Sequence, residues 1–291
     1  MSQVYMLTRR QRLMLLAPLE AILMPFLLVP AHWGFLASFT NYAPAQRHLL
    51  FIGFTNYSRV ARNQEFGAAV RNTVLFTLST VPIELLLGFG LAYLLRRPFR
   101  GRDVLRVFFL LPWLVSPIAN GVMWHFLFNS QVGFINVWLA FFHVAAQPSP
   151  LGVRRLALPA VMLVEIWRTT PLVSFLLLPG LLGIPTEQWE QATLEGASVV
   201  QRISNIALPA LRPLLLTVGL LLAGSALGVF DSILVMTGGG PVSDTLTLGL
   251  FSYNRAFKVF DWPVGATAAW LIVLLVLVVG FAYLRLVRAE E

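Results

Sequence analysis

The feature of this chain that most restricts its fold is a series of long apolar segments. Six of them cover, approximately, residues 13–39, 73–95, 105–128, 157–183, 210–235 and 264–284. Each reaches the ~20 residues that a helix needs to cross a bilayer. Hydrophobic residues make up 57% of the 291-residue chain and charged residues only 12%, whereas soluble domains carry roughly 25% charged residues. The sequence therefore predicts an all-α integral membrane protein, with residues 1–291 forming one domain of six transmembrane helices.

The formal net charge of +8 indicates how these helices are oriented. Five arginines lie within eleven residues after the second segment, at Arg96, Arg97, Arg100, Arg102 and Arg106. Because cytoplasmic loops are enriched in Lys and Arg, we place this loop, the loop between the fourth and fifth segments and both termini in the cytoplasm. Topology and contacts with lipid headgroups account for the excess of cations, so we expect membrane lipids and no nucleic acid as partners.

Several classes of chemistry are excluded by what the chain lacks. A phosphate-binding P-loop needs the pattern G-x-x-x-x-G-K-[ST], and the single lysine, Lys258, stands in the run F-K-V. Cysteine is absent, and the four histidines are isolated from one another in the sequence. We therefore expect no catalytic residue, no metal site and no enzyme, and any ATPase that drives this chain must be a separate polypeptide.

The most polar stretch between two apolar segments is Pro185–Pro213, and it contains the loop 185–208. Residues 186–195 contain no Pro or Gly, so a short helix is allowed there. Gly196 permits a sharp change of backbone direction, and a second helical stretch is expected up to Leu208. Pro209 is suited to the first turn of the next helix. Composition alone fits an ordinary interfacial loop as well as a docking element for another protein.

The order of residues within this stretch resembles a known signature. The pattern E-A-A-x-x-x-G … I-x-L-P is typical of permease subunits of binding-protein-dependent ABC importers. The positions that match it or stand in it are Glu190, Gln191, Ala192, Gly196, Ala197, Leu208 and Pro209. Gln191 departs from the pattern, because it replaces the first alanine.

Other runs resemble the carbohydrate permeases of this superfamily, so that the likeness extends from about residue 12 to 288. They include I-G-F-T-N-Y at 52–57, L-L-P-W-L-V-S-P at 110–117 and a T-x-G-G-P motif that ends at Pro241. The resemblance implies the type I permease fold of ABC importers, with a cytoplasmic coupling helix in the loop after the fourth span. It also implies import of a carbohydrate or carbohydrate derivative by alternating access, in a bacterial inner membrane.

The same resemblance implies a set of partners. They are a second, homologous permease subunit, two ATP-binding cassette subunits that carry ATP and Mg, and an extracytoplasmic substrate-binding protein. This chain is expected to bind no cofactor itself and to form half of the translocation pathway.

Charged residues inside the apolar segments are candidates for that pathway, since each costs at least ~2.5 kcal/mol at a bilayer centre. They are Glu20, Glu84, Glu165, Arg168 and Asp231. Glu165 and Arg168 are three residues apart and can pair on one helical face. Such a pair is compatible with a purely structural role and with lining the pathway.

The resemblance extends the list of pathway candidates. The run V-E-I-W-R-T-T-P-L at 164–172 resembles a segment that lines the sugar cavity in the maltose-type relative. Carried over by position, the candidates are Glu165, Trp167, Arg168, Thr169 and Leu172, together with Ala226, Val229 and Asp231 further along the chain. Ala226 and Val229 stand where that relative has sugar-binding asparagines, which argues against maltose itself.

Two other functions remain open from the residues. An ion-driven secondary transporter would use Glu20, Glu84 and Asp231 as a proton relay, and a membrane enzyme would need a nucleophile or metal site. The lack of an obvious internal repeat and the docking signature argue against the first, and no constellation of residues supports the second. The sequence leaves open whether the ligand is a monosaccharide, a disaccharide, a polyol or a phosphorylated or sulfonated derivative.

Overall fold

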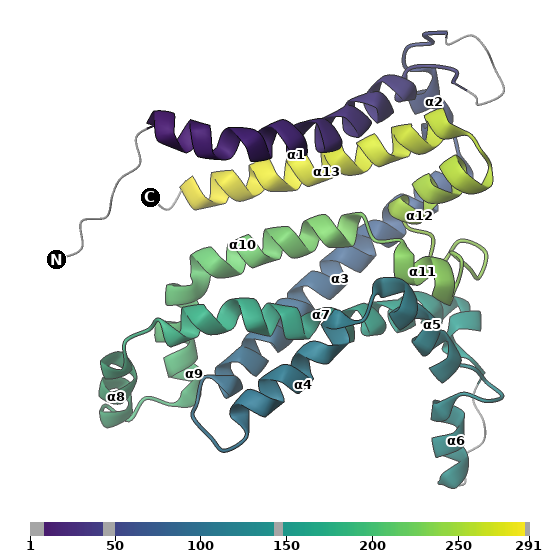
Figure 1. Ribbon diagram of the computed structural model, residues 1–291. Coiled ribbons are helices and arrows are strands. Elements are labelled where there is room, and N and C mark those ends of the chain that lie inside the picture. Colours follow the sequence, from purple (N-terminus) through teal and green to yellow (C-terminus); the bar gives the residue numbers. More distant parts are fainter. Residues whose placement is uncertain (1–8, 43–49, 143–147, 289–291) are drawn as a thin grey trace.

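A computed structural model describes residues 9–42, 50–142 and 148–288 (Figure 1). Within this part of the chain the structure is helical, and the only β-contact is an isolated bridge between Thr40 and Phe51. The α-helices are α1 (Arg9–Ser38), α2 (Thr55–Ala61), α3 (Gln64–Leu95), α4 (Arg102–Leu114), α5 (Pro117–Leu127), α6 (Phe134–Phe141), α7 (Arg154–Leu182), α8 (Thr186–Leu194), α9 (Val199–Arg202), α10 (Leu208–Leu227), α11 (Asp231–Met236), α12 (Leu248–Tyr253) and α13 (Trp262–Arg288). Three shorter turns complete the list, the 3-10 turn η1 (Pro150–Gly152) and the π-helical turns η2 (Ile203–Ala207) and η3 (Asn254–Lys258).

The long apolar helices agree with the predicted fold class. Among the described residues, four helices are long and apolar enough to cross a membrane, at 64–95, 154–182, 199–227 and 262–283. The bent pair α4 and α5 forms a fifth candidate. The first expected span corresponds to α1, whose described apolar part, Leu23–Ser38, is shorter. The all-α membrane fold is thus confirmed, whereas the count of six spans stays a prediction.

The third expected span, 105–128, is broken in the middle into two helices. Helices α4 and α5 meet at an angle of 91°. Val115 and Ser116 both have extended backbone conformations, as expected because Pro117 disfavours a helical conformation for the residue before it. Ser116 then caps α5, since its side chain accepts a hydrogen bond from the Ala119 amide at 3.3 Å.

The fifth expected span, 210–235, also ends early, at Leu227. Gly228 is the C-cap of α10, and the chain is non-helical until Asp231 starts the short helix α11. Asp231 therefore opens a separate helix and does not belong to the long helix that was expected to carry it, and its place within a span stays a prediction. At the other end, α10 begins at Leu208 with Pro209 in its first turn, as predicted. The π-helical turn η2 joins α10 to α9, so that Val199–Leu227 is one continuous helix. Pro209 has no amide hydrogen to donate, which accounts for the π-turn just before it.

Helices α3 and α7 cross at the centre of the bundle, with α4 and α10 packed beside them, while α1 and α13 lie side by side as an outer pair (Figure 1). Gly88 lets α3 approach α7 closely, because a Cβ atom there would lie 2.5 Å from a methyl group of Val173. Helix α8 lies at the end of the bundle where α1 begins and α13 ends, and α5, α11 and α12 lie at the opposite end (Figure 1).

The buried side chains form two apolar clusters along this bundle. One includes Phe76, Val161 and Phe251, and the other, toward α8, includes Phe89, Leu177 and Trp189. On α3 and α7 the polar segments around Glu84 and Glu165 fall between the residues of the two clusters. The fold therefore places its buried charges in a layer between two apolar cores.

Candidate functional site

A cavity of about 150 Å³ lies among four helices in this polar layer. Helix α3 contributes Thr80 and Glu84, α4 contributes Trp113, and the remaining lining side chains come from α7 and α10. On α7 they are Glu165, Arg168, Thr169, Leu172 and Leu176, and on α10 they are Val218, Leu221, Leu222, Ser225 and Ala226. The volume is below the roughly 300–1,000 Å³ of ordinary small-molecule pockets.

The polar centre of the cavity is an ion pair on α7. The Arg168 Nη2 atom donates to Glu165 Oε1 at 2.6 Å, and Nε lies 3.4 Å from Oε2. Thr169 Oγ1 donates to the same Glu165 Oε1 at 3.2 Å. The pair predicted from the spacing is thus present, and its side chains are only 13% and 16% exposed for Glu165 and Arg168.

Helix α3 adds a second carboxyl group to this cavity. Glu84 is 3% exposed, and the hydroxyl of Thr80, one turn away, is buried without a hydrogen-bond partner among the described residues. Carboxylate oxygens accept hydrogen bonds, a guanidinium donates them, and a hydroxyl does both. The cavity therefore presents both donors and acceptors, which is the combination that a polyhydroxylated ligand requires.

The structure gathers five of the predicted pathway residues and separates the other three. Glu165, Arg168, Thr169, Leu172 and Ala226 line the cavity. Trp167, Val229 and Asp231 lie elsewhere and do not line it. Among the lining residues that sequence reasoning did not single out, Trp113 belongs to the motif L-L-P-W but comes from a separate helix, and only the fold brings it to α7.

The three separated residues stand in other parts of the described structure. Trp167 packs edge-to-face against Trp124, with ring centroids 5.4 Å apart. The Val229 carbonyl accepts a hydrogen bond from Thr247 Oγ1 at 2.7 Å, which fixes the break after α10. Asp231 occupies the first turn of α11.

The predicted docking loop forms two short helices at one end of the bundle, α8 and α9. Gly196 has φ +77°, the left-handed conformation that its identity predicted. Ser198 and Gln201 form a reciprocal capping box at the start of α9, with distances of 2.7 and 3.3 Å. A third contact, from Arg202 Nη1 to Thr193 Oγ1 at 3.1 Å, ties α9 back to α8. The loop is thus a folded unit.

The signature residues lie on the outer surface of this unit. Glu190, Gln191 and Gly196 are exposed, Ala192 and Ala197 are half-buried, and Leu208 and Pro209 are exposed at the start of α10. A groove of about 390 Å³ runs beside Glu190 and is lined by Trp189, Thr193 and Leu194. Leu194 is 89% exposed and Val200 74% exposed. These apolar side chains leave a surface that a partner can cover.

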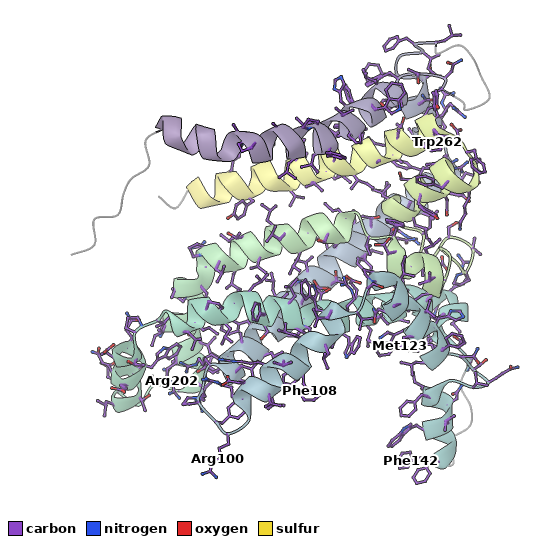
Figure 2. The ribbon with its side chains drawn as sticks, in the orientation of Figure 1. Arg100, Phe108, Met123, Phe142, Arg202 and Trp262 are labelled. Atoms are coloured by element: carbon purple, nitrogen blue, oxygen red, sulfur yellow. The ribbon has the colours of Figure 1, made fainter. Side chains whose placement is uncertain are left out.

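One contact on the inner side of α8 was not predicted from the sequence. The guanidinium carbon of Arg96 lies 3.6 Å from the centre of the Trp189 ring and 4.5 Å from that of Tyr93. The two rings meet edge-to-face at 6.2 Å. Sequence reasoning placed Arg96 in a solvated basic loop, whereas it is clamped between aromatic rings. A tryptophan in an otherwise polar short helix was the available signal. Figure 2 shows Arg202 and Arg100, which lie at the same end of the molecule.

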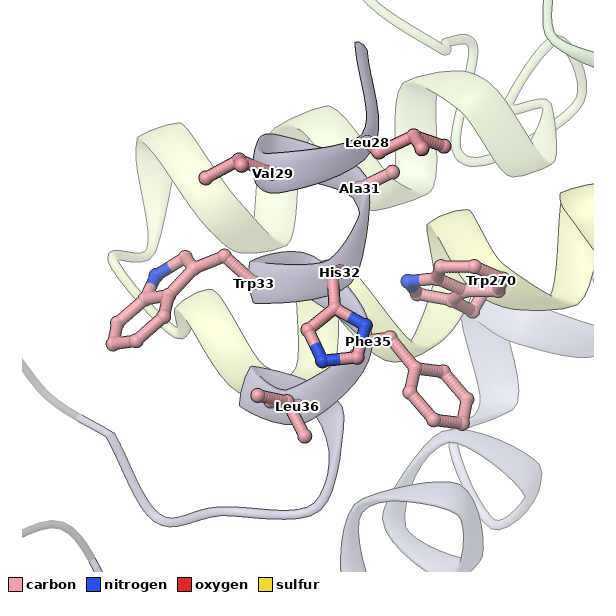
Figure 3. A pocket seen from close by; sticks show the side chains of 8 residues that line it. All are labelled: Leu28, Val29, Ala31, His32, Trp33, Phe35, Leu36 and Trp270. Atoms are coloured by element: carbon pink, nitrogen blue, oxygen red, sulfur yellow. The ribbon is translucent and has the colours of Figure 1, made fainter. Parts of the chain in front are cut away.

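A separate hollow of about 620 Å³ lies between α1 and α13 (Figure 3). Its lining is apolar and aromatic except for His32, and it includes Trp33, Phe35 and Trp270. None of the predicted site residues lines it. In the described part of the chain, no group of three or more His, Cys, Asp or Glu side chains is placed to hold a metal ion. The side chain of Glu20 and the residues His48 and His143 lie outside what the structure describes.

Known proteins resemble this chain over most of its length. A family model described as "Binding-protein-dependent transport system inner membrane component" matches residues 84–290. The trehalose/maltose transport system permease protein MalF of Thermococcus litoralis is 33% identical over 275 residues, which cover 94% of this chain and 92% of that protein. The sulfoquinovosyl glycerol transport system permease protein SmoG of Agrobacterium fabrum is 32% identical over 96% of this chain and 90% of that protein.

A solved structure shares the fold. One chain of a bacterial alginate ABC transporter, in complex with an alginate pentasaccharide-bound periplasmic protein, superposes with a TM-score of 0.80 at 18% identity. The match covers 94% of this chain and 93% of the other. At this identity the likeness concerns the arrangement of the helices.

Proposed function

This chain belongs to the family of inner membrane components of binding-protein-dependent transport systems, and we propose that it forms half of the translocation pathway of a carbohydrate ABC importer. The observation that carries the proposal is the pairing of two features in one molecule. A polar cavity lies within the membrane-spanning bundle, and an exposed helical unit with the docking signature lies at one end of it.

The size of the cavity supports a second permease subunit. At about 150 Å³ the cavity is smaller than the roughly 300–1,000 Å³ of ordinary small-molecule pockets, and the exposed apolar side chains of α4 and α5, such as Phe108 and Met123 in Figure 2, provide a surface for another chain. In the proposed complex the homologous subunit supplies the opposite wall. Glu84, Glu165, Arg168 and Thr169 then face the ligand from this side.

Coupling to ATP runs through α8 in this proposal. The chain carries no P-loop lysine, so ATP and Mg are bound by two partner ATP-binding cassette subunits. One of them receives α8 in a cleft and contacts Glu190, Gln191 and Leu194. Closure of the ATPase pair moves α8, and the attached helices α7 and α10 rotate and open the cavity to the other side. This orientation places α8 and the ends of α1 and α13 in the cytoplasm of a bacterial cell, under the inner membrane.

The substrate class rests on the relatives and on the cavity together. The named relatives import trehalose/maltose or sulfoquinovosyl glycerol by their titles, and a neutral or anionic sugar derivative fits a site with both a guanidinium and carboxylates. An extracytoplasmic binding protein delivers this ligand. The ion-driven alternative has no support, because Asp231 lies outside the cavity that contains Glu84.

The test is reconstitution of the complex that co-purifies with this chain. A ligand is first found by a thermal-shift screen of sugars on the binding protein encoded beside it. In proteoliposomes whose lumen is on the α8 side, uptake of that radiolabelled ligand should require ATP in the lumen. A proton ionophore should leave the uptake rate unchanged. Uptake by this chain without an ATPase, abolished by the ionophore, would refute the proposal.

A further inference from the structure

A second polar hollow, of about 610 Å³, lies at the end of the bundle opposite α8, between the N-terminal halves of α3 and α7. Arg71 of α3 and Arg154 and Arg155 of α7 line it, together with Asp244 from the loop that precedes α12. Apolar side chains, among them Leu75 and Met162, also line it. None of these residues belongs to the cavity around Glu165, so the hollow is a distinct site.

Hydrogen bonds hold the loop that carries Asp244 in place and join Asp244 to Arg154. Asn72 is fully buried, and its amide nitrogen donates to the carbonyl oxygens of Ser243 and Leu246 at 2.8 and 3.0 Å. These bonds hold the loop that carries Asp244 against α3. Asp244 in turn accepts two hydrogen bonds from Arg154, from Nε at 2.8 Å and from Nη2 at 3.2 Å. The ion pair therefore orients Arg154 at the edge of the hollow.

The balance of charge in the hollow is positive. The hydrogen bond from Arg154 holds the pKa of the Asp244 carboxyl below its ordinary value, so this group stays ionised at neutral pH. Three guanidinium groups then face one carboxylate.

We propose that this hollow binds an anionic group, a phosphate, sulfonate or carboxylate, between Arg71 and Arg155. Two planar guanidinium groups from two different helices suit an oxyanion with several acceptor atoms. The apolar wall of Leu75 and Met162 accommodates the hydrocarbon part of the same ligand. An anionic phospholipid headgroup and a free oxyanion share this chemistry. The site does not depend on the proposed transport function, since binding is measured without transport.

The experiment titrates the full chain, purified in a non-ionic detergent, with three probes. They are palmitoyl-oleoyl phosphatidylglycerol, phosphatidylcholine with the same acyl chains, and inorganic sulfate. Lipid binding is measured by native mass spectrometry and sulfate binding with a radiolabel. The test variant is the double substitution R71Q/R155Q, and the matched control is R62Q, which removes an exposed arginine that does not line the hollow.

We expect R71Q/R155Q to bind the anion at least about tenfold more weakly, because each charge-assisted hydrogen bond is typically worth about a factor of ten. R62Q should bind as the unmodified chain does, and D244N should bind more tightly because a competing negative charge is removed. Preference for phosphatidylglycerol without competition by sulfate identifies a lipid headgroup, and arginine-dependent sulfate binding identifies a free anion. Binding that is unchanged in R71Q/R155Q, equally reduced in R62Q or weakened in D244N overturns the proposal.

Discussion

Replacing Arg96 by glutamine should loosen α8 from α3, because it removes the cation between Trp189 and Tyr93. The guanidinium lies 3.6 Å from the Trp189 ring centre, and Trp189 is only 9% exposed. A cation–π contact is worth ~0.5–1 kcal/mol at an exposed site and about 2 kcal/mol when desolvated. We therefore expect a loss of about 1–2 kcal/mol in the free energy that holds α8 in place, which is a factor of about 5–30 in its opening equilibrium.

Amide hydrogen exchange measures this opening directly. When closing is faster than exchange, the exchange rate follows the local opening equilibrium. Amides of α8 should then exchange about 5–30 times faster in R96Q, while those at the centre of α7 should keep their rates. R97Q is the matched control, since Arg97 is the next residue in the chain and is exposed. Equal rates in α8 for R96Q and the unmodified chain would show that the stacked geometry does not hold the helix.

The clamp also bears on coupling, in the complex proposed above. If α8 transmits motion through α3, R96Q should lower the amount of ligand transported per ATP hydrolysed, with ATP hydrolysis itself retained. R97Q should leave this ratio unchanged. If hydrogen exchange shows that α8 is loosened in R96Q but the ratio of ligand transported to ATP hydrolysed is unaltered, motion passes only through the helices that are covalently linked to α8.

Three further outcomes follow from the same contacts. Substitution of Gly196 by aspartate places a side chain at φ +77°, at a cost of ~1–2 kcal/mol. Both this change and Glu190→Lys should abolish uptake, while immunoblots show normal membrane insertion. Normal uptake by both variants would contradict a lever role for α8. Arg168→Ala leaves Glu165 without its cation and should impair uptake while the ATPase still co-purifies, and normal transport by this variant would make Arg168 structural. The pKa of the Asp244 carboxyl is depressed in the folded state, so this group stabilises the fold above its ordinary pKa of about 4, and the stabilisation is lost as the pH falls below that value. The difference in Tm between the unmodified chain and D244N should therefore shrink from pH 7 to pH 3. A difference that does not change would contradict the ion pair.

The fold class was predictable because hydrophobic length is a one-dimensional property. The apolar segments around α3, α7 and α10 are visible in the sequence, and so is the turn at Gly196. The breaks were harder to predict, because the hydropathy of 105–128 and 210–235 does not change at Pro117 or Gly228. Only local backbone preferences end these helices, and such preferences do not end every helix in which they occur.

The candidate site was predictable only where its residues share one helix. The spacing of Glu165, Arg168 and Thr169 fixes their common face in any α-helix. Val229 and Asp231 were misplaced because the helix that was expected to carry them stops at Leu227. Contacts between helices, such as Arg96 on Trp189, depend on how α3 crosses α7, which no local pattern encodes.

Helix α3 is the element that joins the two functional regions. Its 32 residues carry Glu84 into the cavity and end at Arg96 on the ring of Trp189. The two residues are twelve positions apart, which is ~18 Å along a helix, and the segment between them is packed against α7 at Gly88. A helix cannot shorten or bend freely at such a contact, since the interior is close-packed. We therefore infer that a displacement of α8 reaches the cavity through α3 as well as through the covalently linked α7, and the R96Q comparison separates these two routes.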